Sequence, residues 1–180
     1  NGGTDSQTIS INITPVNDAP LLSNNINETI WAEDTNTTIN LTQFFTDIDN
    51  ANLNFSYTSS DNTTLSIDND TDIVTLIPDG NFSGINYVVF IADDGVNTTN
   101  SNNVTLNITS VNDNPWINST IANLTKEEDF SNFIIDLTQY EIDVEDSTTS
   151  LDWSISGVNT SLFSSSIADI DLDILSFTSV

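Results

Sequence analysis

The chain has no cysteine, histidine or methionine, and it carries a single cation, Lys126, against 27 Asp and Glu residues. Without cysteine no disulfide can form, which neither proves nor excludes secretion. Without histidine and cysteine, the usual pairings of a nucleophile with a base are missing. We therefore expect no enzyme activity, although paired carboxylates for glycoside hydrolysis are formally available among so many acids.

The shortage of cations also excludes classes of partner. Phosphate binding needs Lys and Arg, so a formal net charge of −26 argues against nucleic acid and against an anionic membrane surface. The sequence has no run of about 18 apolar residues that would span a bilayer, and no signal peptide opens it. Neither absence says much about location, because a piece of a longer polypeptide would show neither.

What the sequence does contain is a repeat. Residues 16–20 read VNDAP, and residues 111–115, at an offset of 95, read VNDNP. Several independent matches in one order indicate a tandem array. At the same offset, or a few residues more, the matches are Ile9, Ile11 and Ile13 with Val104, Leu106 and Ile108; Glu33 and Asp34 with Glu128 and Asp129; Leu41–Gln43 with Leu137–Gln139; Asp47–Asp49 with Asp143–Glu145; and Phe55 with Trp153.

The repeat divides the chain into three parts. Residues 1–15 are predicted to be the last strand of a preceding repeat, residues 16–111 one complete repeat, and residues 112–180 an incomplete repeat. The incomplete repeat has no counterpart of Tyr87–Gly95 or of the final strand at 102–109. A window of a longer chain explains this better than a subunit that donates residues 6–14 to a neighbour, because two strands are missing and one is spare.

The local pattern predicts an all-β fold. Apolar and polar residues alternate at period two over 9–13, 53–57, 104–108 and 151–155, and further strands are expected near 28–32, 37–45, 65–68, 73–77 and 85–92. Short strands separated by Asn, Asp, Ser and Gly within about 95 residues are typical of a β-sandwich of immunoglobulin size. Residues 123–132 are the one place where a short helical turn is plausible.

The order of motifs in the complete repeat resembles a known family. VNDAP is followed by Glu33-Asp34-Thr35, Asp47-Ile48-Asp49, Asn81-Phe82-Ser83-Gly84 and Tyr87–Gly95. This order is similar to the cadherin-like tandem repeats of prokaryotic surface proteins and adhesins, and more distantly to the cadherin extracellular repeat. The resemblance implies tandem immunoglobulin-like or cadherin-like sandwiches at the cell surface, joined by calcium.

Calcium prefers six to eight oxygen ligands, which carboxylates, Asn side chains and backbone carbonyls supply. Ser110 and Ala19 depart from the cadherin linker, so one or two ions per junction are expected. Plain solvated turns, which also favour Asp and Asn, are the alternative. The ligands that the resemblance implies are Asn17, Asp18, Asp47, Asp49 and Asp93 or Asp94 at the first junction, and Glu33, Asn112, Asp113, Asn114, Asp143 and Glu145 at the second.

Two further acidic patterns stand apart from these junctions. Asp68, Asp70 and Asp72 alternate, as do Asp169, Asp171 and Asp173, but neither set has the glycine of an EF-hand loop. The second set is predicted to form one solvent face of a strand.

Sequons for N-glycosylation are frequent. Only Asn36 and Asn81 have the acidic residue two positions upstream that bacterial transferases are expected to need, which among prokaryotes favours an archaeal source. The fourteen sequons begin at Asn12, Asn27, Asn36, Asn40, Asn54, Asn62, Asn69, Asn81, Asn97, Asn103, Asn107, Asn118, Asn123 and Asn159.

These observations predict a structural module of an extracellular array, in which calcium converts tandem repeats into a stiff, N-glycosylated rod or filament for adhesion. Its partners would be neighbouring repeats of the same chain or filament. The alternative is a carbohydrate-binding or spacer module of a large secreted enzyme, with Trp31, Trp116 and Trp153 as candidate sugar platforms. Of these, Trp153 takes the core phase of its predicted strand.

Overall fold

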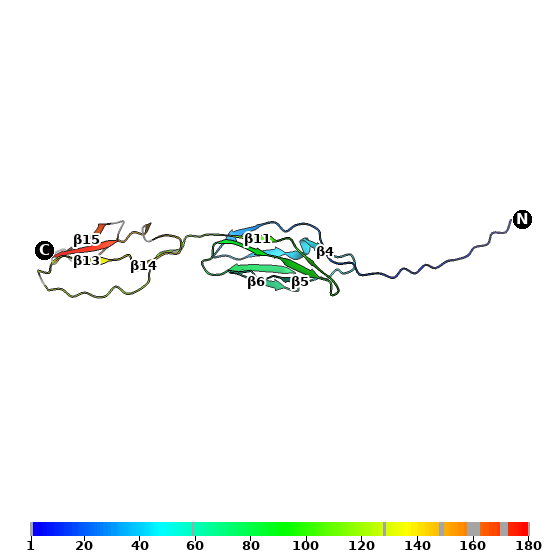
Figure 1. Cartoon of the computed structure of the whole chain (residues 1–180), viewed down its shortest axis with the longest axis horizontal. Helices are drawn as coiled ribbons and strands as arrows, with labels where there is room; N and C mark the ends of the chain where they lie inside the picture. Colours follow the sequence, from blue (N-terminus) through cyan, green and yellow to red (C-terminus); the bar gives the residue numbers. More distant parts are fainter. Residues whose placement is uncertain are drawn as a thin grey trace. The chain divides into compact units, whose positions relative to one another are not determined.

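The computed structural model describes residues 2–58, 60–127, 129–147, 150–157, 163–169 and 173–179. It divides into two compact units, residues 1–109 and 110–180. The described residues contain strands, one short 3-10 turn and no α-helix, so the all-β prediction is confirmed (Figure 1).

The first unit holds eleven strands among its described residues. They are β1 (Leu21–Leu22), β2 (Thr29–Ala32), β3 (Thr37–Asn40), β4 (Phe45–Thr46), β5 (Asn54–Tyr57), β6 (Thr63–Asp68), β7 (Ile73–Pro78), β8 (Gly84–Val88), β9 (Phe90–Asp93), β10 (Thr98–Asn100) and β11 (Val104–Thr109).

These strands form three-stranded sheets of order β2-β11-β8, β3-β7-β6 and β10-β9-β5, and a two-stranded sheet β1-β4. In the first of them β11 is central. It pairs in parallel with β2, where Asn107 lies opposite Ile30, and antiparallel with β8, where Asn107 lies opposite Ile85. The other pairings are antiparallel.

The core of the first unit follows from the alternation along its strands. Val104, Leu106 and Ile108 of β11 are at most 2 % exposed, whereas Thr105 and Asn107 between them are only half-buried. Burying an aliphatic or aromatic side chain contributes about 1.5–3 kcal/mol. The remaining members of the core are Ile26, Trp31, Ile39, Leu41, Phe45, Leu65, Val74, Leu76, Val88, Phe90 and Ala92.

Two predicted strands are interrupted. Residues 37–45 split around the 3-10 turn η1 (Leu41–Gln43), because the Asn40 Oδ1 accepts bonds from the backbone N–H and the hydroxyl of Thr42 at 3.0 and 2.7 Å. Residues 85–92 split at Val89, which bonds Thr58 through both its N–H and its carbonyl. A polar side chain that bonds nearby backbone competes with the strand ladder.

Two other predicted strands are absent from the structure. Residues 2–20 and 150–157 contain no strand, and Ile9, Ile11 and Ile13 are 79–85 % exposed. Alternation makes a segment suitable for a sheet, but a strand forms only where a second strand supplies the hydrogen bonds. No helix is found in the described part of residues 123–132.

The second unit repeats part of the first. Its strands are β12 (Trp116–Ile117), β13 (Phe133–Asp136), β14 (Glu141–Ile142), β15 (Phe163–Asp169) and β16 (Ile174–Ser179). They form sheets β12-β14 and β13-β16-β15, the counterparts of β1-β4 and β3-β7-β6.

The hairpin turns also match between the units. The Leu41 N–H donates to the Asp72 carbonyl at 3.1 Å, and the Leu137 N–H donates to the Asp173 carbonyl at 2.9 Å. Asp72 and Asp173 both have positive φ, of 56° and 49°. The predicted solvent face is therefore wrong for Asp173, which ends a turn and is 1 % exposed. Asp171 lies outside the described residues.

Candidate metal centre

Asp47 begins a tight turn that follows β4. Its Oδ1 accepts hydrogen bonds from the backbone N–H groups of Asp49 and Asn50, both at 2.7 Å. Its Oδ2 is buried and has no hydrogen-bond partner. Leaving a buried acceptor unsatisfied costs about 1–3 kcal/mol, and more when the group is charged. A cation bound at this oxygen would therefore compensate the buried negative charge of the Asp47 carboxylate.

The linker residues Asn17 and Asp18 lie against the same turn. The Asp18 N–H donates to the Asp49 Oδ2 at 2.7 Å. The Asn17 amide donates to the Asp94 Oδ2 at 2.9 Å and to the Asp18 carbonyl at 2.8 Å. Two residues far apart in sequence, Asp49 and Asp94, thus hold the same short peptide.

Asp93 ends β9, and Asp94 begins the loop from β9 to β10, which turns at Gly95 with φ of 91°. The Asp94 Oδ1 accepts from the N–H groups of Val96 and Asn97 at 2.7 and 2.6 Å. The Asn97 N–H, followed by the Asn17 amide, lowers the pKa of Asp94 below its ordinary value. The carboxylate is thereby kept in the ionised form that a metal ligand needs.

The same arrangement occurs in the second unit. The Asp143 Oδ1 accepts from the N–H groups of Glu145 and Asp146 at 2.9 and 2.8 Å, while its Oδ2 is buried without a hydrogen-bond partner. The Asp113 N–H donates to the Glu145 Oε2 at 2.9 Å. The Asn112 amide donates to the Asp113 carbonyl at 2.6 Å, as Asn17 does to Asp18. Two separate turns of different sequence therefore present the same buried oxygen.

The structure thus groups most of the predicted ligands. Hydrogen bonds connect Asn17, Asp18, Asp47, Asp49 and Asp94 in one unit and Asn112, Asp113, Asp143 and Glu145 in the other, with Asp93 and the exposed Asn114 next to them in sequence. Whether they bind metal stays a prediction.

Sequence reasoning missed Asn50 and Asp146, which occupy the same position of the two turns. Each donates its backbone N–H to the first Asp of the turn, and the Asn50 amide also donates to the Asp94 carbonyl at 3.2 Å. The spacing of three residues from Asp47 and Asp143, which is typical of turns closed by an Asp side chain, was the available signal.

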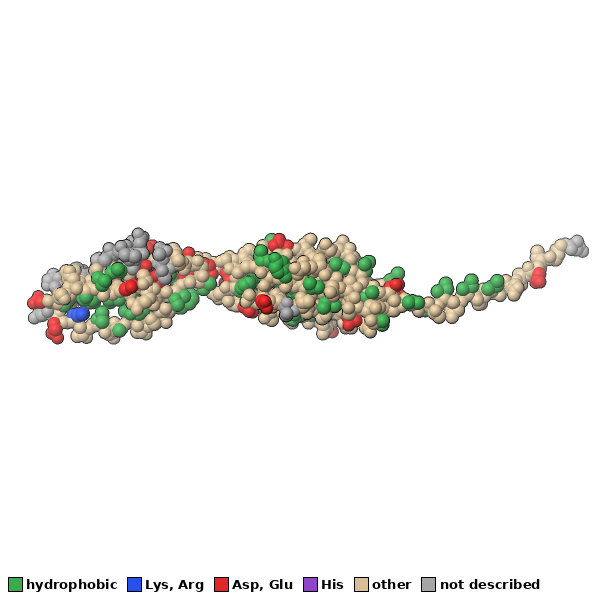
Figure 2. Space-filling model, in the orientation of Figure 1, with side chains coloured by type: hydrophobic (Ala, Val, Ile, Leu, Met, Phe, Trp, Pro, Cys, Tyr) green, Lys and Arg blue, Asp and Glu red, His purple; other side chains and the backbone are tan. Residues whose placement is uncertain are grey.

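The chemistry of this donor set fits a hard cation, because it consists of carboxylate, amide and backbone oxygens. Within the described residues, no three acidic side chains converge into a ready-made cage. A bound ion would therefore complete its shell with Asn and backbone oxygens or with water. The single Lys126 lies 4.5 Å from the centre of the Phe133 ring. Figure 2 shows acidic side chains at many places on the visible face and only this one cation.

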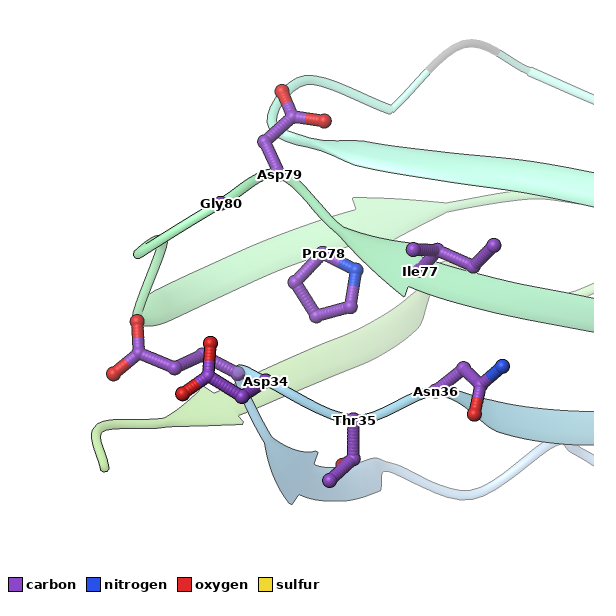
Figure 3. Close-up of a pocket in the computed structure, with 8 residues that line it drawn as sticks. Asp34, Thr35, Asn36, Ile77, Pro78, Asp79 and Gly80 are labelled. Atoms are coloured by element: carbon purple, nitrogen blue, oxygen red, sulfur yellow. The ribbon is translucent and has the colours of Figure 1, made fainter. Parts of the chain in front are cut away.

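Glu33, predicted as a ligand of the second junction, belongs to the first unit and is 3 % exposed. It lines an open cavity of about 310 Å³ together with Asp34, Pro78 and Asp79. Figure 3 shows Asp34 and Asp79 on opposite sides of Pro78, with the Asp79 carboxylate directed away from it. The grouping of Glu33 with the ligands predicted for the second junction stays a prediction.

Most sequons lie at the surface. Asn40 and Asn107 are half-buried, and Asn159 lies outside the described residues. The exposed sequon residues are Asn12, Asn27, Asn36, Asn54, Asn62, Asn69, Asn81, Asn97, Asn103, Asn118 and Asn123.

The tryptophans differ in exposure. Trp31 is 8 % exposed and Trp116 46 % exposed. Trp153 is half-buried, and its indole N–H donates to the Glu141 Oε2.

Across the described residues, no helix is both long enough and apolar enough to cross a membrane. No curated protein matches the chain. Among solved structures, an endo-fucoidan hydrolase of glycoside hydrolase family 107 is 20 % identical, with a TM-score of 0.43 over 90 % of this chain and 24 % of its own. The chain thus spans about a quarter of that hydrolase.

The model of the cadherin-like domain matches residues 16–109, more than half of the 180 residues, and the protein therefore belongs to the cadherin-like domain family.

Proposed function

We propose that this chain is a structural module of an extracellular rod or filament, in which calcium fastens each linker peptide to the acidic turns of the repeat that follows it. The observation that carries the proposal is the pair of equivalent buried oxygens, Asp47 Oδ2 and Asp143 Oδ2, neither of which has a hydrogen-bond partner. Membership of the cadherin-like family, whose domains generally bind calcium, supports the same conclusion.

The residues of the turn have distinct roles. Asp47 keeps one oxygen on the backbone of its own turn and presents the other to the ion, while Asp49 holds the linker through the Asp18 N–H. Bound calcium supplies the positive charge that offsets these neighbouring carboxylates. Without it they repel one another, and the linker is held only by exposed hydrogen bonds. Fixing the linker in this way limits the angles that successive repeats can adopt.

Glycans and location belong to the same proposal. A cadherin-like domain suggests an extracellular location. Exposed sequons on many strands and turns would carry N-linked glycans, and the near absence of Lys and Arg removes the sites that trypsin-like proteases cleave. Both properties suit a cell-surface adhesin or filament, for which we propose an archaeal source and no catalytic activity.

The second candidate, a carbohydrate-binding or spacer module of a secreted enzyme, has less support. A sugar platform needs exposed aromatic rings, and only Trp116 among the three tryptophans is exposed. A TM-score of 0.43 to the fucoidan hydrolase adds no argument.

Thermal unfolding of the full chain in calcium and in chelator tests the proposal. A ligand that binds only the folded state stabilises it by about 2.7 kcal/mol at a concentration 100-fold above its Kd. We expect Tm to rise with calcium. Asp47→Asn and Asp143→Asn should each remove part of this rise, because the amide can still close the turn but puts an NH2 group where the buried oxygen lies.

Asp70→Asn is the matched control, since it removes the same charge from an exposed turn outside the two sites. It should leave the calcium-dependent rise unchanged. Spin labels placed in the two repeats should give a narrower distribution of distances with calcium than with chelator. A Tm that does not respond to calcium would reject calcium as the fastening ion.

A further inference from the structure

The outer face of the β2-β11-β8 sheet carries an apolar patch. Ile30 of β2 is 59 % exposed, and Ile85 and Tyr87 of β8 are 57 % and 54 % exposed. Large apolar side chains that gather on one face of a sheet usually meet a partner. A covering group is therefore expected over Ile30, Ile85 and Tyr87.

Asn107 lies at the centre of the patch. It belongs to β11, the middle strand, and is in register with Ile30 on one side and with Ile85 on the other. Thr105, on the same face of β11, is in register with Tyr87. Residues in register on neighbouring strands are about 5 Å apart, so a group attached to Asn107 lies within reach of these side chains.

Asn107 is also the first residue of the sequon Asn107-Ile108-Thr109. The equivalent residue of the preceding repeat is Asn12, 95 residues earlier, which begins the sequon Asn12-Ile13-Thr14. The sequon thus recurs at the equivalent position of the repeat.

We propose that an N-linked glycan on Asn107 covers this patch, with the apolar face of its first sugars packed on Tyr87, Ile30 and Ile85. The inference deepens the proposed function, because it rests on the extracellular, glycosylated character assigned to the chain. A second copy of the chain is a poorer occupant, since two molecules of net charge −26 repel each other.

The attachment chemistry is compatible with the contacts of Asn107. An oligosaccharide carried on a lipid phosphate is the required donor: a bond forms between the Asn107 Nδ2 and the sugar C1, and the bond from C1 to the phosphate oxygen breaks. The lipid phosphate leaves with the bonding electron pair, and the amide loses one of its two protons. The remaining N–H can still donate to the Glu28 Oε1, with which the Nδ2 makes a bond of 3.1 Å. This bond joins the Nδ2 to the residue that precedes β2.

The test compares the full chain made in a secreting host that attaches N-glycans with the full chain made in a bacterium that does not. Glycopeptide mass spectrometry reports whether Asn107 is modified. Tm is measured in both hosts for the wild type and for Asn107→Gln, and the difference isolates the glycan at this site from those at other sequons.

We expect Asn107 to be occupied and its glycan to raise Tm by roughly 2–5 °C, a size typical of modest contacts in a domain of this length. In a Tyr87→Ser background the rise should fall to near zero. Asn54→Gln is the matched control, because Asn54 begins a sequon on β5, in a different sheet, and the glycan effect at Asn107 should not depend on it.

Two results would overturn the inference directly: an unmodified Asn107, or a glycan effect on Tm that Tyr87→Ser leaves unchanged. A third would be a chain without sugar that forms a dimer, if Tyr87→Ser makes that dimer dissociate. This result would identify a second copy as the occupant. None of them would alter the calcium-dependent rise in Tm, so failure here is distinguishable from failure of the proposed function.

Discussion

Glu141 and Trp153 form a partly buried hydrogen bond in the second unit, in which the indole N–H donates to the Glu141 Oε2 at 2.5 Å. In the first repeat the matching positions hold Phe45 and Phe55, whose rings lie 5.6 Å apart at 55°. Phe45 pairs with Leu22, and Glu141 pairs with Ile117, in equivalent two-stranded sheets. A polar pair in one repeat thus takes the place of an aromatic pair in the other.

Glu141→Gln is expected to stabilise the second unit at pH 7. Burial is the main cause that raises the pKa of Glu141, and the charges of Asp173 and Asp136 raise it further, against the opposing effect of the Trp153 bond. A glutamine keeps an acceptor for the indole and removes the buried charge. We expect a gain on the order of 1 kcal/mol in the free energy of unfolding, measured by chemical denaturation.

The pH dependence of this effect has a definite sign. The pKa of Glu141 is higher in the folded state than in the unfolded state. The contribution of protonated Glu141 to the free energy of unfolding is therefore fully present below the unfolded pKa, and it is lost as pH rises through the folded pKa. The advantage of Glu141→Gln should therefore shrink as pH falls toward 4. Glu127→Gln, an exposed change of the same charge, is the control, and equal effects of the two variants would contradict the explanation.

Phe45→Ala is expected to cost the first unit about 3–5 kcal/mol, because a fully packed aromatic side chain is replaced by a cavity. Phe45 is 3 % exposed and contacts Phe55. Ile48→Ala, three residues away at a side chain 84 % exposed, should change stability by less than about 0.5 kcal/mol. Urea unfolding of both variants checks the pair, and comparable losses would mean that Phe45 is not a core residue.

Asp72→Asn is expected to raise Tm at pH 7. Burial first, and repulsion by Asp68 second, raise the pKa of Asp72. Asparagine tolerates the positive φ of 56° and keeps the backbone carbonyl that binds the Leu41 N–H. As with any acid whose pKa is raised by folding, the gain should diminish as pH falls through the folded pKa. Melting curves at pH 7 and pH 4 measure it, with Asp70→Asn as the exposed control, and a gain that is the same at both values would refute the charge argument.

Asn17→Ala is expected to raise the pKa of Asp94 in the calcium-free protein, but only partly toward the ordinary value. The larger cause of the lowered pKa, the Asn97 N–H, remains after the substitution. Because this pKa is lowered by folding, the stability from Asp94 is present above its unfolded pKa and is lost as pH falls through the folded value. Carboxyl NMR titration gives the result directly. Asn112→Ala, the equivalent change in the second unit, should leave Asp94 unchanged, and a full return of its pKa in Asn17→Ala would show that the Asn97 bond contributes nothing.

The acidic turns could be predicted from the local sequence pattern. Asp47 and Asp49, with Asp143 and Glu145, were recognisable from a repeated motif, because a side chain that closes its own turn needs only residues two or three positions away. The bonds from Asp18 to Asp49 and from Asp113 to Glu145 could be predicted only in part, because the linker and the turn are 31 and 32 residues apart in the two units.

Local pattern failed where a distant partner decides the outcome. Ile9, Ile11 and Ile13 alternate as Val104, Leu106 and Ile108 do, yet only the second set is buried, because β2 and β8 flank it. Asp173 was placed on a solvent face, but its side chain is buried, with 1 % exposed.

The one-dimensional order of residues was enough to establish the charge, the repeat, the all-β class and the candidate acidic turns, since composition, periodicity and side-chain-to-backbone turns depend on neighbours in the chain. It could not show which carboxylate oxygen is buried, that Asn107 lies between Ile30 and Ile85, or that Glu141 bonds Trp153. These relationships depend on residues that are distant in the chain, and they exist only once the segments have packed and water has been removed from between them.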